Sequence, residues 1–403
     1  MTTFDLLVFL VKIRKNYIPN NKQFQNFGIL GIRLAQEYSF RIDFLDERIC
    51  SSLMELHSSL IENQNIHLMT LIPRGKPILL SMEYFDNEPF SSTFTTQVYK
   101  GSLKNGLDIA IKVINPKAKN IFLNKLLKLK NRIKQIDFFN PKLSKNLCLK
   151  EIYNEIEEIN LNKFLLQSEI DTTKKFEKKR KEYEEKYMLD KLAFPQLIPS
   201  LSSENYIIGE FIYGTPMKVL LEDIKSKYHT VLEIIRYHFF YIFIVGKFHS
   251  DIHPGNIVVG DDSKIYFIDC NTYLEIDDNF RKSFFKFLYN ISTRDYIQVA
   301  KGLLDMCEVD FSRSNLLTFA EKLKEELKEI YNLNLSQINF TQTLMKALKM
   351  AMQYGLKLPH STFNLLKAIN RLEKILKKTM HTEIFIKDLN KILEIYKDDE
   401  RLK

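Results

Sequence analysis

The chain has 403 residues, of which 45% are apolar, enough to bury a hydrophobic core in one large domain or two lobes. Its net charge is +9, but acids are interleaved in the lysine-rich stretch "KKFEKKRKEYEEK", which favours a solvated helix face over a nucleic-acid or membrane patch. The four cysteines show no metal-ligand or disulfide spacing, which excludes the zinc-site and disulfide-framework classes and is typical of a reducing compartment.

Membrane-spanning and secretory patterns are missing from the sequence. The best apolar runs, "LLVFLV" and "HFFYIFIVGKF", fall short of the roughly 18 residues needed to cross a bilayer. Asp5 stands where a signal peptide carries basic residues. We therefore expect a cytoplasmic protein without a transmembrane segment or signal peptide, with peripheral attachment to a membrane as the alternative.

The first half of the chain alternates between helical and strand patterns. Residues 1–66 have apolar residues at helical spacing, with a break near 41–43. Residues 74–115 contain short runs rich in β-branched and aromatic residues, "PILLSMEYF", "TTQVYKGSL" and "LDIAIKVIN", and the Asn-Gly of "LKNGLD" predicts a hairpin. Residues 118–192 are again predicted to be helical, with an exposed charged segment.

The second half is predicted to be mostly helical. "NYIIGEFI" predicts a strand and "YGTP" the break after it. Residues 217–248 and 275–403 have helical spacing. The order of elements places the natural boundary between two lobes near residue 214.

The stretch "FHSDIHPGNIVVG", residues 248–260, gathers polar side chains ahead of an apolar strand. Asp251 precedes Asn256 by five positions, and a Pro-Gly pair keeps the loop between them out of a helix. Asn256 opens the predicted strand "IVV", and Asp269 ends its partner "IYFID". A hairpin of this form brings the side chains of Asn256 and Asp269 toward one point.

Phosphoryl transfer requires such a grouping, because it needs oxygen ligands for Mg²⁺ and a carboxylate near the incoming nucleophile. The pattern H-x-D-x-x-x-x-N followed by an Asp at a strand end is typical of protein-kinase loops. Cys270 and Asn271 replace the Phe-Gly that follows this Asp in kinases. The alternative is a polar hairpin turn, since Asp, Asn and His are common loop residues. We expect His253 to shape the loop rather than bind a metal.

Lys112 lies mid-strand in "LDIAIKVIN", in the context A-I-K that matches the phosphate-binding V-A-I-K pattern. The alternative is a lysine on the exposed face of its strand. "GEFIYG" would link the two lobes, where backbone groups around Glu210 to Ile212 would bond adenine. The acid that holds the lysine should come from the helical stretch "KEIYNEIEEINLNKF", in which spacing alone leaves open Glu151, Glu155, Glu157 and Glu158.

These segments resemble the UbiB-type atypical kinases of coenzyme Q (ubiquinone) biosynthesis, over about residues 25 to 385. "FHSDIHPGNIVV" resembles that family's F-H-A-D-x-H-P-G-N signature, which ordinary kinases lack. "LGIRLAQEYSFRIDFL" is similar to its K-x-G-Q element, "KEIYNEIEEINLNKF" to E-x-D-x-x-x-E-A-x-N, and "YIIGEFIYGTP" to its linker. "PFSSTFTTQVYKGSLKNGLDIAIKV" is similar to its Ala-rich loop, hairpin and strand lysine.

The resemblance implies an α+β, protein-kinase-like fold of two lobes. An N-terminal helical extension, residues 1–70, would pack over the nucleotide site. The N-lobe, residues 71–214, would combine a small antiparallel sheet with a charged helical insert at about 118–192. The helical C-lobe, residues 215–403, would carry the catalytic loop and the metal site.

The resemblance also implies roles for single residues. Lys112 would contact the nucleotide phosphates, with Glu157 of the E-A-x-N position as its helix partner. Asp251 would be the acidic residue of the catalytic loop. The implied magnesium ligands are Asn256 and Asp269, and the other implied nucleotide-site residues are Gln36, Gln97, Glu210 and Ile212.

Departures from the family pattern fall on its regulatory elements. Arg33 and Ala35 replace the Lys and Gly of K-x-G-Q, Tyr153 replaces the Asp of E-x-D, and the Ala-rich loop contains Phe94. Arginine keeps the charge of lysine but not its compact ammonium geometry. The pattern predicts a divergent member that keeps the metal and phosphate groups.

We therefore expect an ATP- and Mg²⁺-binding atypical kinase or ATPase that supports ubiquinone or isoprenoid-lipid metabolism. A pseudokinase-like scaffold with weak or no turnover is the alternative. A small-molecule phosphotransferase is a third hypothesis, against which the R-L-A-Q helix argues. The expected partners are the nucleotide and lipid or quinone-pathway proteins at a membrane surface, and no nucleic acid. The phosphoacceptor and the oligomeric state stay open.

Overall fold

The computed structural model describes residues 3–402 except 16, 20–22, 24–25, 43–44, 55–67, 69–71, 73–75, 94, 223–226, 271–272, 307–312, 329–338, 354–359 and 380–384. The chain forms two compact units. The first comprises Met1–Lys174 and Pro195–Ile212, and the second comprises Lys175–Phe194 and Tyr213–Lys403.

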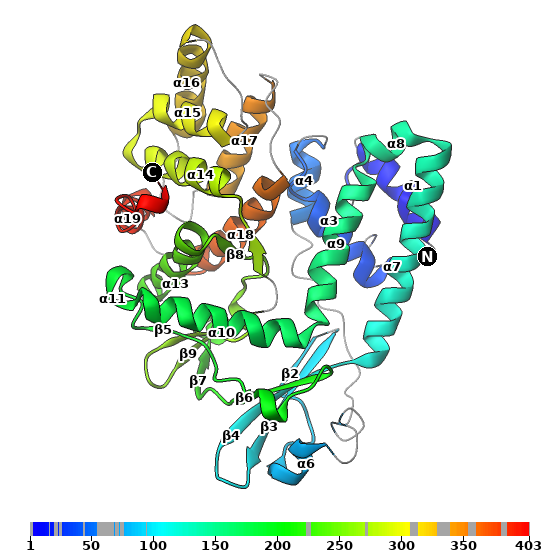
Figure 1. Ribbon diagram of the computed structural model, residues 1–403. Helices are drawn as coiled ribbons and strands as arrows, with labels where there is room; N and C mark the ends of the chain where they lie inside the picture. Colours follow the sequence, from blue (N-terminus) through cyan, green and yellow to red (C-terminus); the bar gives the residue numbers. More distant parts are fainter. Residues whose placement is uncertain are drawn as a thin grey trace. The chain divides into compact units, whose positions relative to one another are not determined.

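An antiparallel sheet organises the first unit. Its order is β1-β3-β4-β6, with β2 paired to β3 (Figure 1). The predicted Asn-Gly hairpin joins β3 and β4, and Gly106 takes φ +83°, which an L-residue adopts only with strain. One face of the sheet packs around Tyr99, Ile111 and Ile208. The strands are β1 (Met82–Phe85), β2 (Ser91–Ser92), β3 (Thr96–Leu103), β4 (Asp108–Ile114) and β6 (Tyr206–Glu210).

The sequence "PILLSMEYF" is only half strand. Residues Pro77–Ser81 form the short helix α6, and β1 begins at Met82. Pro77 stands at the first helical turn, where its missing N–H costs nothing and its fixed φ suits a helix. The strand predicted for these five residues is therefore wrong.

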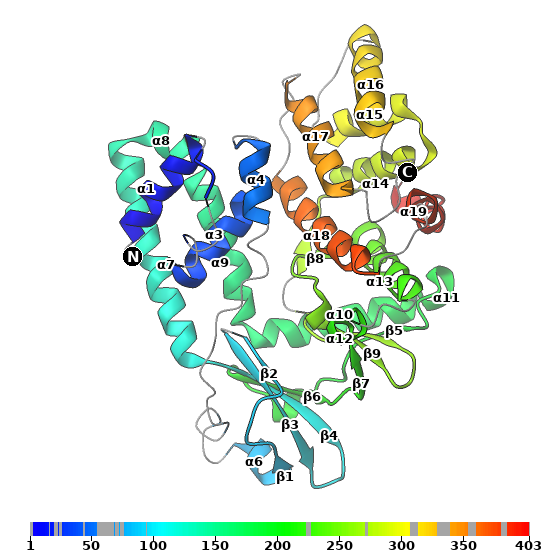
Figure 2. The same ribbon diagram turned by 180° about the vertical axis from the view of Figure 1, so that it is seen from behind.

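Helices complete the first unit. Figures 1 and 2 both show α3 beside α9 and α1 against α7, and these pairs are in contact. Their packing explains the apolar spacing of residues 1–54 and 118–163. The helices are α1 (Thr3–Arg14), α3 (Gly28–Tyr38), α4 (Glu47–Met54), α7 (Pro116–Phe139), α8 (Pro141–Asn146), α9 (Leu149–Lys163) and α10 (Leu166–Glu182), together with the 3₁₀ turn η2 (Pro199–Leu201).

Two small sheets lie in the second unit. One has the order β5-β10-β9-β7 and the other pairs β11 with β8. "YGTP", expected to be a break, contributes β7, which pairs with β9. The strands are β5 (Leu192–Ala193), β7 (Gly214–Pro216), β8 (Lys247–His249), β9 (Ile257–Gly260), β10 (Ile265–Phe267) and β11 (Tyr273–Glu275).

Helices make up most of the rest of the second unit, as the spacing predicts. The π-helical turn η3 (Tyr241–Val245) continues α13 and buries Tyr241 to Ile244 in the core. The helices are α11 (Glu184–Tyr187), α12 (Met217–Leu220), α13 (Tyr228–Phe240), α14 (Asp278–Thr293), α15 (Tyr296–Met306), α16 (Arg313–Leu327), α17 (Phe340–Gln353), α18 (His360–Lys377) and α19 (Phe385–Glu394), with 3₁₀ turns η4 (Pro254–Asn256) and η6 (Glu400–Leu402).

Residues 175–194 do not belong with the N-lobe sheet, in contrast to the predicted boundaries. Phe176 packs its ring edge-on against Tyr273 with the ring centres 4.0 Å apart, and β5 pairs in parallel with β10. These aromatic and backbone contacts tie the segment to the second unit. Helix α10 therefore begins in one unit and ends in the other.

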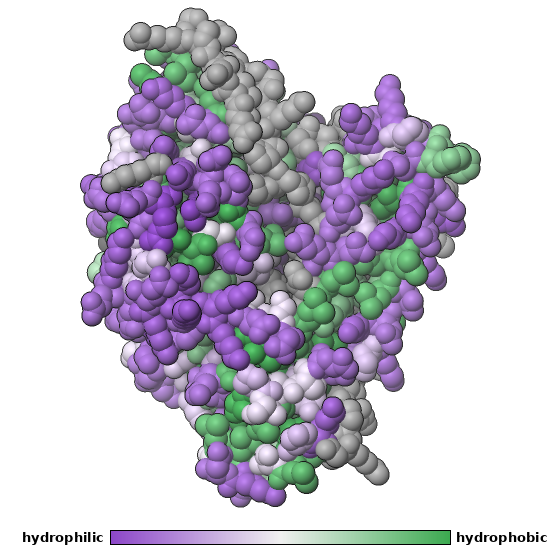
Figure 3. Space-filling model, viewed as in Figure 1, coloured by the Kyte–Doolittle hydropathy of each residue, from purple (hydrophilic) through white to green (hydrophobic). Residues whose placement is uncertain are grey.

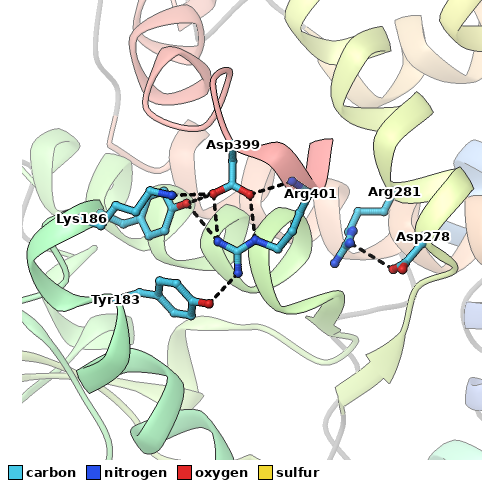
Figure 4. A network of polar contacts seen from close by, with 7 residues as sticks. Tyr183, Lys186, Asp278, Arg281, Asp399 and Arg401 are labelled. Atoms are coloured by element: carbon cyan, nitrogen blue, oxygen red, sulfur yellow. Dashed lines mark hydrogen bonds and ion pairs between the residues drawn. The ribbon is translucent and has the colours of Figure 1, made fainter. Parts of the chain in front are cut away.

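A buried polar network ties the end of the chain to the second unit (Figure 4). The Asp399 carboxylate accepts hydrogen bonds from Arg401 Nε at 2.7 Å, Lys186 Nζ at 2.8 Å and the Tyr187 hydroxyl. Arg401 also donates to the Tyr183 hydroxyl at 2.9 Å. The hydrogen bonds from Arg401 hold the pKa of Asp399 well below its ordinary value. Among the helices that the structure describes, none has the length and apolarity to cross a bilayer.

Candidate active site

Lys112 forms a buried ion pair with Glu169. Its ammonium nitrogen lies 2.7 Å from Oε2 and 2.9 Å from Oε1 of Glu169, and the two side chains are 14% and 5% exposed. Strand β4 presents the lysine, and the first turn of α10 presents the acid. A carboxylate at this end of a helix is also favoured by the helix dipole. The ion pair therefore holds the Lys112 ammonium in a defined position and favours its charged form.

The partner predicted for Lys112 is wrong. Glu157 instead accepts a hydrogen bond from the Tyr153 hydroxyl at 2.6 Å and lies 3.4 Å from Lys130. Glu151 is 62% exposed and lies 3.6 Å from Arg41. Both glutamates are on α9, whereas the helix that supplies the partner is the next one along the chain.

A pattern in the sequence could have indicated Glu169. The buried positions of α10 include Leu166, Glu169, Ile170, Thr173 and Phe176, which share one face of the helix. An acid on an otherwise apolar face must find a partner, because an unpaired buried charge is costly. The preceding helix α9 is also rich in acids, so acid content alone does not distinguish Glu169 from the glutamates of α9.

Three of the other residues predicted at the nucleotide site make contacts within the first unit. Gln97 is 1% exposed and accepts a hydrogen bond from the Tyr99 hydroxyl at 2.9 Å. Gln36 accepts one from Arg33 at 3.0 Å. The Glu210 N–H donates to Gln196 at 2.9 Å. Contact with a nucleotide stays a prediction for these residues.

The linker expected to bond adenine leaves little choice of donors. The N–H groups of Glu210 and Phe211 are both used within the first unit, and the latter donates to the Asp108 carbonyl at 3.0 Å. An N–H donor to adenine from this stretch would therefore have to come from Ile212. That role also stays a prediction.

In the second unit, His249 joins the loop that carries Asp251 to the segment that carries Asp269. Its Nδ1 accepts the N–H of Asp251 at 3.1 Å, so Nε2 carries the proton and donates to the Asp269 carbonyl at 2.8 Å. Burial lowers the pKa of His249 from 6.5 to about 4, so the ring is neutral near pH 7. A neutral ring protonated on Nε2 can accept the Asp251 N–H and donate to the Asp269 carbonyl at the same time.

Asn256 and Asp269 flank the β9–β10 hairpin, as the sequence predicts. Phe267 pairs with Ile257 in this hairpin, and the Ile268 N–H donates to the Asn256 carbonyl at 3.0 Å. The Asn256 amide nitrogen donates to the Asp251 carbonyl at 3.2 Å. Hydrogen bonds therefore connect all three predicted residues through the backbone.

His253 shapes the loop, as predicted. Its Nδ1 accepts the Gly255 N–H at 3.0 Å and caps the turn η4. A Cβ on Gly255 would lie 2.9 Å from the His253 ring, so glycine allows this close approach. The pair places Asn256 at the start of β9.

The carboxylate of Asp251 has a partner that the sequence did not indicate. Arg371 of α18 lies 2.8 Å from Asp251 Oδ1 and also donates to the Ser250 carbonyl. Its position 120 residues downstream gives no local signal. The guanidinium of Arg371 fixes the orientation of the Asp251 carboxylate and balances its negative charge.

The Asp-Cys-Asn segment is described only in part. Cys270 is 2% exposed, with Sγ 3.8 Å from the Phe267 carbonyl, so it packs as a small buried group. Asn271 and Phe94, two of the departures from the family pattern, lie outside the described residues.

The donor set of the loops fits a magnesium ion bound together with a nucleotide. Within the described ranges, no cluster of three His, Cys, Asp or Glu side chains is found. Magnesium does not need one, since it binds through one or two protein groups together with phosphate oxygens and water. The Asn256 amide nitrogen is engaged, so its oxygen is the atom suited to a cation, alongside the Asp269 carboxylate.

Comparison with known proteins decides the family. A family model described as "ABC1 atypical kinase-like domain" matches residues 59–303, which is more than half of the chain. The chain belongs to the ABC1 atypical kinase-like family. Its fold is accordingly the α+β kinase-like fold that the sequence predicts.

Relatives within the ABC1 family are distant. The uncharacterised protein slr0889 of Synechocystis is 24% identical over 88% of this chain and 89% of its own length. A "Probable protein kinase UbiB" of Vibrio atlanticus is 26% identical over 68% of this chain, and one of Klebsiella pneumoniae is 25% identical over 87%. The chain spans 50% and 65% of those two proteins.

A solved structure supports the ABC1 kinase-like fold. The Mycobacterium tuberculosis protein Rv3197, solved in complex with erythromycin, has a TM-score of 0.51 over 77% of each chain and is 17% identical. At this identity the likeness concerns the fold alone.

Proposed function

We propose that the chain binds ATP with Mg²⁺ and transfers or hydrolyses the terminal phosphoryl group. Lys112 would hold the nucleotide phosphates, and Asn256 and Asp269 would hold the metal. The bound ion would neutralise the charge that develops on the phosphate oxygens. Asp251 would orient the attacking hydroxyl or water and accept its proton.

The Lys112–Glu169 ion pair is the single observation that carries the proposal. A buried ion pair that only stabilised the fold could be replaced as a whole by apolar residues, often without loss of stability. Here the acid on a separate helix holds the ammonium in a defined position. Phosphoryl transfer uses such a lysine because the protein mainly positions charge around the phosphates.

The substrate class rests on the family relatives. Several are named probable protein kinases UbiB, and we infer for this chain a role in ubiquinone or related isoprenoid-lipid metabolism. Lipid or quinone-pathway proteins at a membrane surface would then be its partners, and its attachment there would be peripheral.

One observation favours the scaffold alternative. Arg371 engages the Asp251 carboxylate at 2.8 Å, and a carboxylate held this way is a weaker proton acceptor unless the arginine moves or the substrate replaces it. On that hypothesis the chain binds nucleotide with little or no turnover.

Titration of a fluorescent ATP analogue, with and without Mg²⁺, tests the proposal. We expect Mg²⁺ to tighten binding to the wild type and Asp269→Asn to lose most of this gain, about tenfold or more, since a charged ligand is removed. Asp261→Asn, in the exposed turn of the same hairpin, is the matched control and should bind as the wild type does.

The outcomes separate the hypotheses. If the wild type shows no Mg²⁺-dependent binding, the enzyme proposal fails. Binding that Asp269→Asn leaves unchanged contradicts the metal assignment. Mg²⁺-dependent binding without ATP hydrolysis or phosphoryl transfer supports the scaffold.

A further inference from the structure

The net charge of the chain comes from one segment of the first unit. Residues 116–150, which cover α7 and α8, contain ten Lys or Arg residues and one acid, Asp137. The whole chain has 59 basic and 50 acidic residues, so this excess of nine equals the net charge of +9. The remaining residues are electrically balanced, and the segment is a localised basic surface.

The corner between α7 and α8 carries two exposed aromatic side chains. Phe138 and Phe139 are 81% and 82% exposed, the highest values among the large hydrophobic side chains described as exposed. Their rings meet edge-on with centres 5.1 Å apart. Figure 3 shows hydrophobic surface at the outer end of this helix pair, surrounded by hydrophilic residues.

The corner is held firmly by the rest of the helix pair. The opposite face of α7 is buried through Phe122, Leu126, Leu129 and Ile133, so the helix cannot turn to hide the two rings. The Asn140 side chain caps α8 by accepting the Leu143 N–H at 3.1 Å. The exposed rings are therefore a fixed feature of the folded unit.

Positive charge lies next to the rings. Lys134, Lys142 and Lys145 are exposed on the turns on either side of the corner. Asp137, the acid of the segment, lies 2.6 Å from Lys150, which neutralises it. Apolar rings and uncompensated lysines thus occupy one small surface.

We propose that the α7–α8 corner docks on an anionic lipid bilayer, with Phe138 and Phe139 inserted below the headgroups and Lys134, Lys142 and Lys145 bound to lipid phosphates. Interfacial segments combine apolar rings with basic residues in this way. A protein interface would instead place its apolar residues in a core poor in charge. Nucleic acid would engage the lysines but would not require two exposed phenylalanines.

This inference extends the lipid-surface part of the proposed function, but it does not depend on nucleotide binding. Sedimentation with vesicles, without ATP, tests it. We expect the full chain to bind vesicles of phosphatidylglycerol and phosphatidylcholine, to bind pure phosphatidylcholine far more weakly, and to dissociate at about 0.5 M salt, where surface charges are screened.

Two sets of variants test the residues. Lys134→Gln with Lys142→Gln and Lys145→Gln should weaken binding about 100-fold, at about fivefold for each lysine. Phe138→Ser with Phe139→Ser should weaken it about tenfold or more. The matched controls, Lys301→Gln with Lys324→Gln and Lys346→Gln, and Leu80→Ser, change exposed residues elsewhere and should bind as the wild type does.

The chain lacks tryptophan, so Phe139→Trp provides a single fluorescent reporter. We expect its emission to shift to the blue with anionic vesicles and to be quenched by brominated lipid, whereas Leu80→Trp should not respond. The proposal is overturned if the wild type ignores anionic vesicles, if the reporter stays in water, or if the protein binds DNA or RNA in place of vesicles. Since no nucleotide is used, failure here leaves the ATP proposal standing, and failure of ATP binding leaves this one standing.

Discussion

The candidate residues fall into two sets, a lysine half in the first unit and a loop half in the second, and the two sets differ in how far apart their members lie along the chain. In the second unit, Asp251, Asn256 and Asp269 lie within 19 residues and are connected by hydrogen bonds of the loop and hairpin. In the first unit, 57 positions separate Lys112 from Glu169. Local geometry therefore fixes one half, whereas helix packing selects the partner in the other.

The largest effect is expected from the loop half. Asp251→Asn should lower ATP turnover about 10³-fold, because a positioned base contributes roughly 10²–10⁴-fold. Nucleotide affinity should change little. Turnover equal to that of the wild type would exclude Asp251 as the catalytic base and favour the scaffold alternative.

The lysine half is tested by two glutamates. Glu169→Gln should lower the free energy of unfolding by about 3 kcal/mol, because it leaves a buried ammonium without its counter-charge. Glu157→Gln, on the neighbouring helix α9, should cost less than about 1 kcal/mol, because its lysine contact is partly exposed. Urea unfolding of both variants checks the difference, and equal losses would contradict the assigned partner.

Acid should destabilise the folded chain through two buried histidines of the second unit, His249 and His238. The pKa of His249 is lowered by burial to about 4, and that of His238 to about 3, so the folded state resists protons that the unfolded state binds below about pH 6.5. The free energy of unfolding should fall by about 1 to 2 kcal/mol, at about one extra proton bound by the unfolded state, for each histidine between pH 6.5 and pH 5.

Unfolding curves at several pH values measure this slope. The slope depends on how many more protons the unfolded state binds than the folded state, and His249→Asn and His238→Phe should each lower this number by about one. His249→Asn should also lower turnover, because it breaks the bonds to Asp251 and Asp269, whereas His238→Phe should not. A slope that neither variant changes would show that other groups carry the acid sensitivity.

The smallest effect is expected from the long-range contact of the loop half. Arg371→Lys keeps the charge but loses the fork that reaches both Asp251 and the Ser250 carbonyl, and should change turnover about tenfold with unchanged ATP affinity. A fall in turnover indicates that Arg371 positions the Asp251 carboxylate for the reaction. A rise in turnover indicates that Arg371 restrains this carboxylate. Lys374→Gln, exposed on the same helix, is the control.

The sequence alone determined the elements whose causes are local. Alternation and Asn-Gly placed β3, β4 and Lys112. The spacing of Asp251, Asn256 and Asp269 placed the loop and hairpin, because turn residues and strand pairing act over a few positions. The family-specific string around His249 also indicated the kinase-like fold that the comparisons confirm.

Only the tertiary structure decided which distant groups meet. The partner of Lys112 is Glu169 and not the predicted Glu157, because the buried acid that faces the lysine lies on α10 and not on α9. Arg371 reached Asp251 from α18, and residues 175–194 joined the second unit through aromatic packing and the pairing of β5 with β10. The pairing of buried charges depends on which helix faces pack together, and that choice is made by the whole core rather than by any short stretch of sequence.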